Sequence, residues 1–239
     1  MTRPSAEFPR KRKRSMLYIT NTVAKKLVMA ITGAMLFGFT LIHLLGNSSV
    51  FIGPEGINAY AMSLQSLGPL VWVFRATLLT AFLIHVLFGI TLSLENRSAR
   101  SQKYAVIRHL RTTLGARTMI WTGLFFIFFL VFHLLHFTFH VIAPEFSARA
   151  HLDVMGRPDV FMMVVRSFRQ YLFPGVYVLG VALLVLHLSH GLQSLFQTTG
   201  LNDDRTLPII KRAGLITAIV LLIGYTAIPL AIFTGVFAK

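Results

Sequence analysis

Long apolar runs separated by short polar stretches divide this chain of 239 residues. An α-helix of about 20 apolar residues crosses a hydrocarbon core of about 30 Å, and five runs are long enough. They cover residues 27–45, 70–94, 118–142, 174–196 and 213–237. The pattern predicts an all-α integral membrane protein in which four transmembrane helices form a bundle and the fifth is peripheral. We expect residues 1–26 to be a retained basic arm and residues 27–239 to form the transmembrane domain.

The composition supports a membrane location. Apolar residues make up 55% of the chain and charged residues only 13%, with a mean hydropathy of +0.69, which is too apolar for an ordinary soluble domain. The net charge of +15 does not indicate a nucleic-acid partner, because the basic residues lie in short stretches between the apolar runs. The lack of cysteine excludes disulfides, thiolate-bound iron–sulfur clusters and covalently attached c-type haem. If the protein moves electrons, another subunit must hold the iron–sulfur centres.

The basic residues also predict the topology. Eight precede residue 27, six lie in 95–117 and three in 198–212, against none in 47–69. Residues 143–171 carry four and the C-terminus one. Because basic residues collect on the cytoplasmic side, we expect a cytoplasmic N-terminus and an external C-terminus in a bacterial cytoplasmic membrane.

Two polar stretches have features of their own. The segment 158–172 has apolar residues at helical spacing, and we expect it to lie flat on the outer membrane surface. The basic run 10–14 is typical of a lipid-binding or topology signal, and docking of a partner subunit stays open as the alternative.

Histidines are the ionisable residues that stand out at membrane depth. Imidazole is the usual axial ligand of b-type haem, and an ionisable residue in hydrocarbon is a functional candidate by default. Six fall inside the predicted helices, and a seventh lies at the outer end of the third helix: His43, His85, His133, His136, His187, His190 and His140.

Distances along the helices sort four of these histidines into two levels. At about 1.5 Å per residue, His43 and His133 lie roughly 25 Å from the inner face. His85 and His187 lie roughly 15 Å from that face. Each level holds two histidines from different helices, which predicts two bis-histidine haems.

An internal repeat supports the choice of His43 and His133. Residues 32–45 and 122–135 both read Thr-Gly, nine residues, then His-Leu-Leu, and a methionine precedes each Thr-Gly by three residues. The match favours His133 over His136 as a ligand.

A weaker similarity relates the second and fourth predicted helices. Gly89 follows His85 by four residues and Gly191 follows His187 by four, so each glycine leaves room beside an imidazole for a flat porphyrin. This spacing favours His187 over His190.

Other interpretations remain open. His136, His140 and His190 could bond to a haem ligand, to a haem propionate or to a quinone, or could form hydrogen bonds between helices. Single glycines could serve helix contact alone: Gly33, Gly38, Gly89, Gly123, Gly180 and Gly191. A haem-free transporter with a histidine relay is the main competing function.

Several stretches resemble a known family. The chain reads Leu-Ile-His-Leu-Leu-Gly-Asn at 41–47, Asn-Ala-Tyr-Ala at 58–61, Ser-Leu-Gly-Pro-Leu at 66–70, Leu-His-Leu-Ser-His-Gly-Leu-Gln-Ser at 186–194 and Gln-Thr-Thr-Gly-Leu at 197–201. These stretches resemble the di-haem cytochrome b subunit of succinate dehydrogenase and quinol:fumarate reductase, over nearly the whole chain from about Lys25 to Gly235.

The resemblance implies a quinone-reactive membrane subunit of succinate:quinone oxidoreductase. It places two b haems on His43 with His133 (distal) and His85 with His187 (proximal), and implies menaquinone as the usual quinone. It also implies a flavoprotein and an iron–sulfur subunit on the cytoplasmic face, with a dimer of heterotrimers as one arrangement. One position departs from the pattern, because Val185 stands where the fumarate reductase branch has a proton-conducting glutamate.

The quinone site is expected near the outer ends of the first three helices. Reduction of a quinone needs donors and proton carriers, and the candidates there are Asn47, Ser48, Glu55, Arg75, His140 and Glu145. Arg75 could instead neutralise a haem propionate or extend to the membrane interface. A di-haem cytochrome b of a hydrogenase or formate dehydrogenase is the alternative within quinone-reactive complexes.

Overall fold

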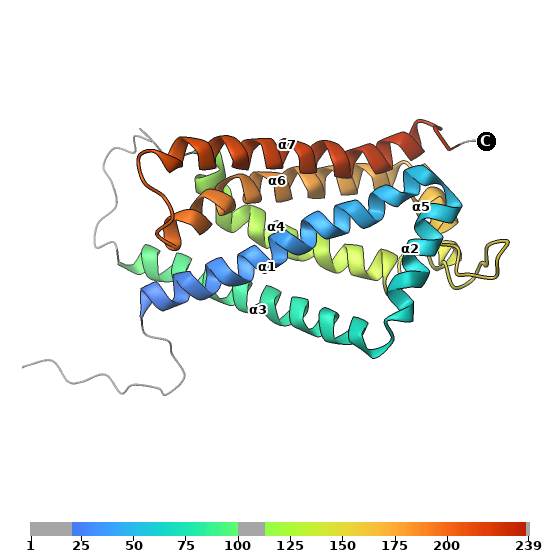
Figure 1. Cartoon of the computed structure of the whole chain (residues 1–239), viewed down its shortest axis with the longest axis horizontal. Helices are drawn as coiled ribbons and strands as arrows, with labels where there is room; N and C mark the ends of the chain where they lie inside the picture. Colours follow the sequence, from blue (N-terminus) through green and yellow to red (C-terminus); the bar gives the residue numbers. More distant parts are fainter. Residues whose placement is uncertain (1–20, 100–112, 238–239) are drawn as a thin grey trace, which may run out of the picture.

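Five long helices dominate the computed structural model, which describes residues 21–99 and 113–237 (Figure 1). Each is long and apolar enough to cross a membrane. They are α1 (Thr22–Ser48), α3 (Pro69–Ser98), α4 (Leu114–Phe137), α6 (Leu172–Thr198) and α7 (Thr206–Phe233). The predicted all-α fold with five transmembrane helices is confirmed. The basic run 10–14, for which lipid or partner binding was predicted, lies outside the described residues.

Two shorter helices lie together at one end of the molecule, called here the α2/α5 end (Figure 1). They are α2 (Pro54–Ser66) and α5 (Val160–Arg169), and the 3-10 turns Ser49–Ile52 and Pro144–Phe146 accompany them. Hydropathy does not predict α2, because its 13 residues are too few and too polar to register as a span. Proline at its first position and Gly53 before it, with φ 94°, are typical of a helix start.

Four of the long helices form a ring. Helix α1 packs against α3 and α6, and α4 packs against α6 and, more sparsely, against α3. Helix α7 lies outside this ring against α6 and α1, where Tyr225 donates a hydrogen bond to the Thr40 carbonyl at 2.6 Å. The fifth helix is therefore peripheral to the bundle, as predicted.

Helix α4 ends earlier than its apolar run. Hydropathy predicted a helix to residue 142, but the helix ends at Phe137 and the chain turns through His140 and Ala143, with φ 54° and 53°. Left-handed backbone interrupts a helix whatever the polarity of the residues, and Pro144 follows. His140 therefore lies in a turn and not at the end of the third transmembrane helix, which corrects the prediction.

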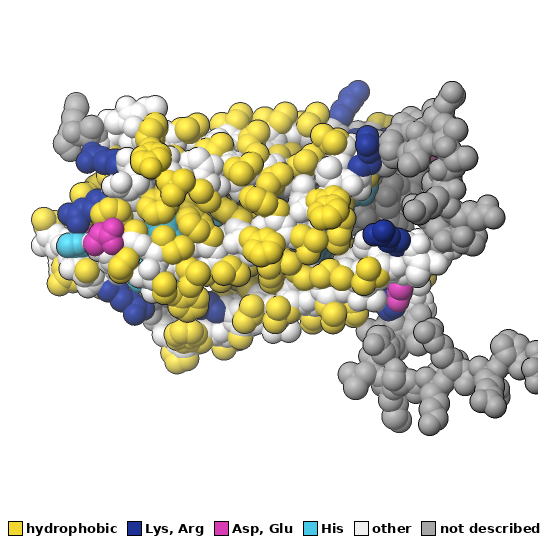
Figure 2. Space-filling view, turned by 180° about the vertical axis from the view of Figure 1, so that it is seen from behind, with side chains coloured by type: hydrophobic (Ala, Val, Ile, Leu, Met, Phe, Trp, Pro, Cys, Tyr) yellow, Lys and Arg dark blue, Asp and Glu magenta, His cyan; other side chains and the backbone are white. Residues whose placement is uncertain are grey.

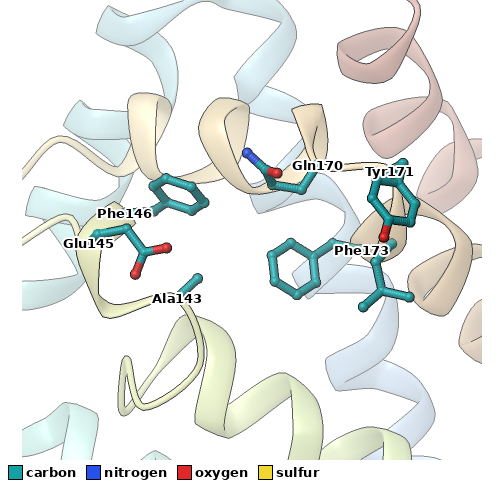
Figure 3. Close-up of a pocket in the computed structure, with 7 residues that line it drawn as sticks. Ala143, Glu145, Phe146, Gln170, Tyr171 and Phe173 are labelled. Carbon is teal, nitrogen blue, oxygen red and sulfur yellow. The ribbon is translucent and has the colours of Figure 1, made fainter.

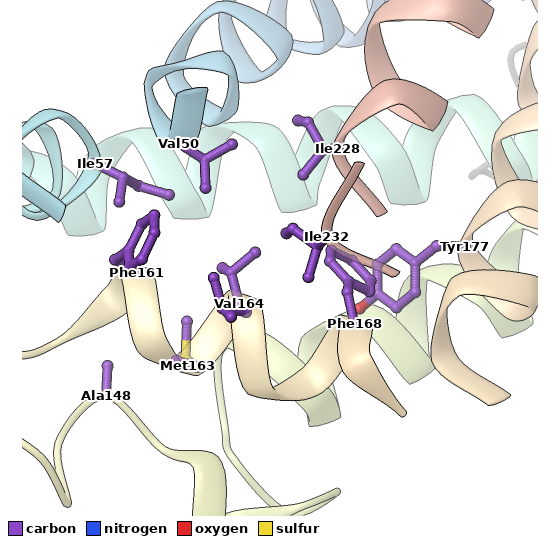
Figure 4. Close-up of a cluster of buried hydrophobic side chains, with 11 residues drawn as sticks. Val50, Ile57, Ala148, Phe161, Met163, Val164, Phe168, Tyr177, Ile228 and Ile232 are labelled. Atoms are coloured by element: carbon purple, nitrogen blue, oxygen red, sulfur yellow. The ribbon is translucent and has the colours of Figure 1, made fainter. Parts of the chain in front are cut away.

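Helix α5 is covered by protein. Its apolar residues Phe161, Val164, Val165 and Phe168 are buried and belong to one cluster with residues of α2, α6 and α7 (Figure 4). Lipid cannot reach this face, so the expectation that the segment lies with its apolar face on the membrane is wrong. Burial against other helices satisfies the same amphipathic pattern.

The sides of the bundle are apolar. Hydrophobic side chains cover its length, and most charged side chains gather toward its ends (Figure 2). On α4, Trp121 and Phe128 are 71% and 75% exposed. Large exposed apolar surfaces of this kind fit a lipid environment.

Two couples of histidines as a candidate cofactor site

The ring of four helices brings four histidines together in two couples. The ring centres of His43 on α1 and His133 on α4 are 5.9 Å apart, and those of His85 on α3 and His187 on α6 are 6.5 Å apart. These are the couples that the depth estimate predicted, and each helix of the ring contributes one member.

The spacing within each couple suits one metal ion held between two imidazoles. A metal–imidazole bond of about 2 Å on each side, with about 1 Å from each nitrogen to its ring centre, gives roughly 6 Å. Over the described ranges, no group of three or more histidine, aspartate or glutamate side chains could hold a metal ion. Two protein ligands per metal fit a group that brings its own equatorial nitrogens, as haem does.

The second ring nitrogen of His85 and of His187 is already hydrogen-bonded. His85 Nδ1 lies 3.1 Å from the Met29 carbonyl and 3.3 Å from Thr32 Oγ1, while His187 Nδ1 lies 3.2 Å from Thr122 Oγ1. An occupied Nδ1 fixes the ring and leaves Nε2 as the nitrogen that can bind iron.

Glycine makes room for both of these rings. A Cβ at Gly33 would lie 3.0 Å from His85 Cε1, and one at Gly123 would lie 3.3 Å from His187 Cε1. In each copy of the internal repeat, the threonine therefore bonds to the histidine of a neighbouring helix and the glycine leaves space for its ring. This contact site is called here a Thr-Gly seat. Sequence reasoning found the repeat, but did not link its threonines to these imidazoles.

The other four glycines that the sequence singled out divide into two kinds. Gly38, Gly89 and Gly191 have open space where a side chain would begin, and the last two lie one turn from His85 and His187. This is the room that the porphyrin interpretation requires. A Cβ at Gly180 would overlap the Phe129 ring, so that glycine serves the close packing of α6 on α4.

The other membrane-depth histidines differ from the couples. His136 is buried with both ring nitrogens engaged: Nδ1 lies 3.1 Å from the Tyr177 hydroxyl and Nε2 lies 3.1 Å from Ser167 Oγ. A ring bonded at both nitrogens has none left for iron, which supports His133 over His136. His190 has a buried Nδ1 without a hydrogen-bond partner in the part of the chain that the structure describes.

The six quinone-site candidates are spread over several elements. Asn47 and Ser48 bond to carbonyls of their own helix α1, at 2.7 Å and 2.8 Å. The Arg75 guanidinium is exposed and lies over the Trp72 ring at 4.9 Å, an arrangement that suits the membrane interface. His140 lies in the turn after α4, and Glu145 lines a hollow near the start of α6.

This hollow has a volume of about 500 Å³ at the α2/α5 end. Glu145 and Phe146 lie on one side of it, with Tyr171 and Phe173 on the other and Gln170 between them (Figure 3). Of these residues, sequence reasoning named only Glu145. Phe146 lies in the 3-10 turn after α4, and Gln170, Tyr171 and Phe173 lie at the α5–α6 junction, where no histidine or charge drew attention to them.

Glu55 is bound in an ion-pair cluster, called here the clasp. Arg157 donates to both Glu55 oxygens at 3.0 Å and 2.9 Å and to Asp153 Oδ2 at 2.8 Å. Asn58, which is 1% exposed, donates to Asp153 Oδ2 at 3.1 Å and accepts from the Phe161 amide at 2.9 Å. The clasp joins α2 to the loop before α5, which gives Glu55 a structural partner.

The clasp sets the protonation of Asp153. Burial alone would raise the pKa of this carboxyl, but hydrogen bonds from Arg157, Asn58 and the Met155 amide outweigh it and lower the pKa from 3.8 to about 2. The hydrogen bond from Arg157 likewise lowers the pKa of Glu55. Both groups are therefore ionised at neutral pH.

The clasp predicts a pH dependence of stability. Because its pKa is lower in the folded state, the Asp153 carboxylate stabilises the fold fully above about pH 4, and this contribution disappears as the pH falls toward about 2. The difference in melting temperature between the wild type and Asp153→Asn should be largest near pH 6 and shrink over that acid range. A difference that stays constant with pH would contradict this role.

Taken together, five apolar spanning helices and two interhelical couples of histidines define a multi-pass helical membrane protein whose bundle can hold cofactors between its helices. Residues 6–108 match the family model of the succinate dehydrogenase/fumarate reductase transmembrane subunit, which supports the predicted family. The matched segment includes His43 and His85 but ends before His133 and His187. Comparisons with curated proteins and with solved structures found no match.

Proposed function

We propose that this chain is the membrane-anchor cytochrome b subunit of a succinate dehydrogenase or fumarate reductase complex and carries two b haems. The observation that carries the proposal is the pair of histidine couples, with ring centres 5.9 Å and 6.5 Å apart. His43 and His133 would hold the distal haem iron, and His85 and His187 the proximal one. When bound, the two haems would supply one-electron carriers between an iron–sulfur subunit and membrane quinone.

The two couples belong to different depths in the bundle. Thr32, which bonds to His85, precedes His43 by eleven residues on α1, or roughly 16 Å along the helix. This separation supports two distinct cofactor levels across the membrane, with each haem clamped by rings from opposite helices.

The uneven basic residues support an orientation with a cytoplasmic N-terminus. The flavoprotein and iron–sulfur subunits would then dock on the face that carries the N-terminus. The His85/His187 couple would be the nearer one to them, and the α2/α5 end would face outward.

The hollow beside Glu145 is the proposed quinone site. Phe146 and Phe173 offer aromatic walls, and Gln170 and Tyr171 can donate hydrogen bonds to a quinone carbonyl. His140 lies three residues before Ala143, which lines the hollow; burial, helped by the charge of Arg149, lowers the pKa of His140, so its imidazole is neutral near pH 7. Menaquinone is the expected quinone.

Gln170→Ala tests this location. Loss of one hydrogen bond to the quinone head group should raise the KM for quinone about tenfold. The rate with succinate and a soluble dye should not change, because the dye bypasses the hollow. Ser63→Ala, an exposed change at the same end of the molecule, is the control. An unchanged KM in Gln170→Ala would place the quinone elsewhere.

The identity of the reductant distinguishes this proposal from its alternatives. Adding succinate to the purified complex should reduce a b-type absorbance that belongs to this subunit. Reduction by hydrogen or formate, with none by succinate, would favour a hydrogenase or formate dehydrogenase cytochrome. A colourless subunit would favour the haem-free histidine relay.

A further inference from the structure

A buried hydrogen-bond chain extends from the distal ligand His133 to helix α5. His133 Nδ1 lies 3.3 Å from the Tyr177 hydroxyl, and that hydroxyl lies 3.1 Å from His136 Nδ1. His136 Nε2 then lies 3.1 Å from Ser167 Oγ. We infer that Tyr177, His136 and Ser167 are positioning residues that hold the His133 ring and set the reduction potential of the distal haem. The inference rests on the proposed function.

The chain has a consistent direction of donation. His133 Nδ1–H can donate to the Tyr177 oxygen, the Tyr177 hydroxyl to His136 Nδ1, and His136 Nε2–H to Ser167 Oγ. Each proton and each acceptor is then used once, and Nε2 of His133 is left for iron. The role of His136 as a relay of hydrogen bonds explains why an ionisable residue that does not bind iron lies at this depth.

Packing leaves these groups little freedom. His136 and Ser167 are 3% and 1% exposed, and the His136 ring lies between Phe137 at 4.1 Å and Phe173 at 4.4 Å. The Tyr177 ring meets Phe168 of α5 edge-on at 4.9 Å. Since the rings are fixed on several sides, the hydroxyl of Tyr177 is presented to His133 in one arrangement.

The two levels are therefore held differently. At the proximal level, His85 and His187 bond to groups on the very helices, α1 and α4, whose glycines receive them. At the distal level, His133 bonds to Tyr177 of α6 and Tyr177 bonds to His136. His136 in turn bonds to Ser167 of α5. Phe173, against which His136 packs, also lines the hollow, so the same chain adjoins the proposed quinone site.

The chain has a chemical consequence for the ligand. An acceptor at Nδ1 makes an imidazole a more basic ligand and favours ferric over ferrous iron. Removing the acceptor should therefore make the distal haem easier to reduce. A tenfold change in its reduction equilibrium corresponds to about 59 mV for one electron.

Tyr177→Phe in the intact complex is the test, with a redox titration of the two b components and a haem count. Both haems should remain. The reduction potential of one b component should rise by about 59 mV, which is a tenfold change in its reduction equilibrium, while the potential of the other component stays unchanged. Ser167→Ala should give a smaller shift of the same component, and Ser167→Thr should restore the wild-type value. Thr122→Val is the matched control. It should change the reduction potential of the other b component, because Thr122 bonds to His187.

The outcomes separate this inference from the function on which it rests. Two haems with unchanged potentials in both Tyr177→Phe and Ser167→Ala would overturn the inference and leave the proposed function intact. Equal shifts of both components would also overturn it, because a general loosening of the bundle affects both levels. A wild-type subunit without haem would overturn the proposed function, and the inference with it.

Discussion

Replacing His85 or His187 with alanine should lower the haem content of the subunit from two to one. Each imidazole is one of the two proposed protein ligands of the proximal haem, and alanine offers no ligand atom. Electron transfer from succinate to quinone should fall at least about 100-fold, because the proximal haem is the proposed link to the iron–sulfur subunit. Succinate oxidation with a soluble dye should persist. Pyridine haemochrome analysis and the two assays measure these effects.

His190→Gln is the matched control. His190 lies one helical turn beyond His187 on α6, and this variant should keep both haems. If His190→Gln lost a haem and His187→Ala kept two, the assignment of ligands on α6 would be wrong.

Replacing Gly33 with leucine should remove the proximal haem almost as effectively as loss of the ligand itself. A Cβ at this position already approaches His85 Cε1 to 3.0 Å, and the longer side chain would occupy the place of the ring. The His43/His133 couple should keep its haem, so the count should fall from two to about one. Gly123→Leu should act in the same way through His187, since the repeat builds both seats alike.

Smaller changes give a graded comparison. Gly33→Ala forces His85 to move by a few tenths of an ångström and should shift the proximal potential, whereas Gly38→Ala has open space and should change nothing. Retention of both haems with unchanged potentials in Gly33→Leu would show that His85 does not occupy this seat in the assembled complex.

The transmembrane core was predictable because lipid imposes simple rules on sequence. A span needs about 20 apolar residues, so five helices follow from hydropathy alone. Ionisable residues are rare at that depth, so His43, His85, His133 and His187 were visible as candidates, and distance along each helix sorted them into couples. The structure brings those couples together, while their binding of haem stays a prediction.

The ends of the helices were less predictable, because hydropathy reflects the preference of side chains for water or lipid and not the geometry of the backbone. The turn at His140 lies in an apolar stretch, so the end of α4 was placed five residues too late. Helix α2 was too short to register as a span. Helix α5 showed its amphipathic pattern, but protein and lipid can cover such a face equally well, and only the fold shows which one does.

Contacts between distant residues were the hardest to foresee. The clasp joins Glu55 to Arg157 across a separation of 102 residues, and neither residue has a local pattern that names the other. The hydrogen-bond chain from His133 to Ser167 likewise needs the relative positions of α4, α5 and α6. The Thr-Gly seats could have been predicted, because the repeat places a threonine and a glycine at matching positions on two helices.

A haem count on the purified wild-type complex tests the central claim most directly. The reduced-minus-oxidised difference spectrum, calibrated per copy of this subunit, should show b-type absorbance equivalent to two haems. An intact complex with active succinate oxidation and no b-type absorbance from this subunit would contradict the account.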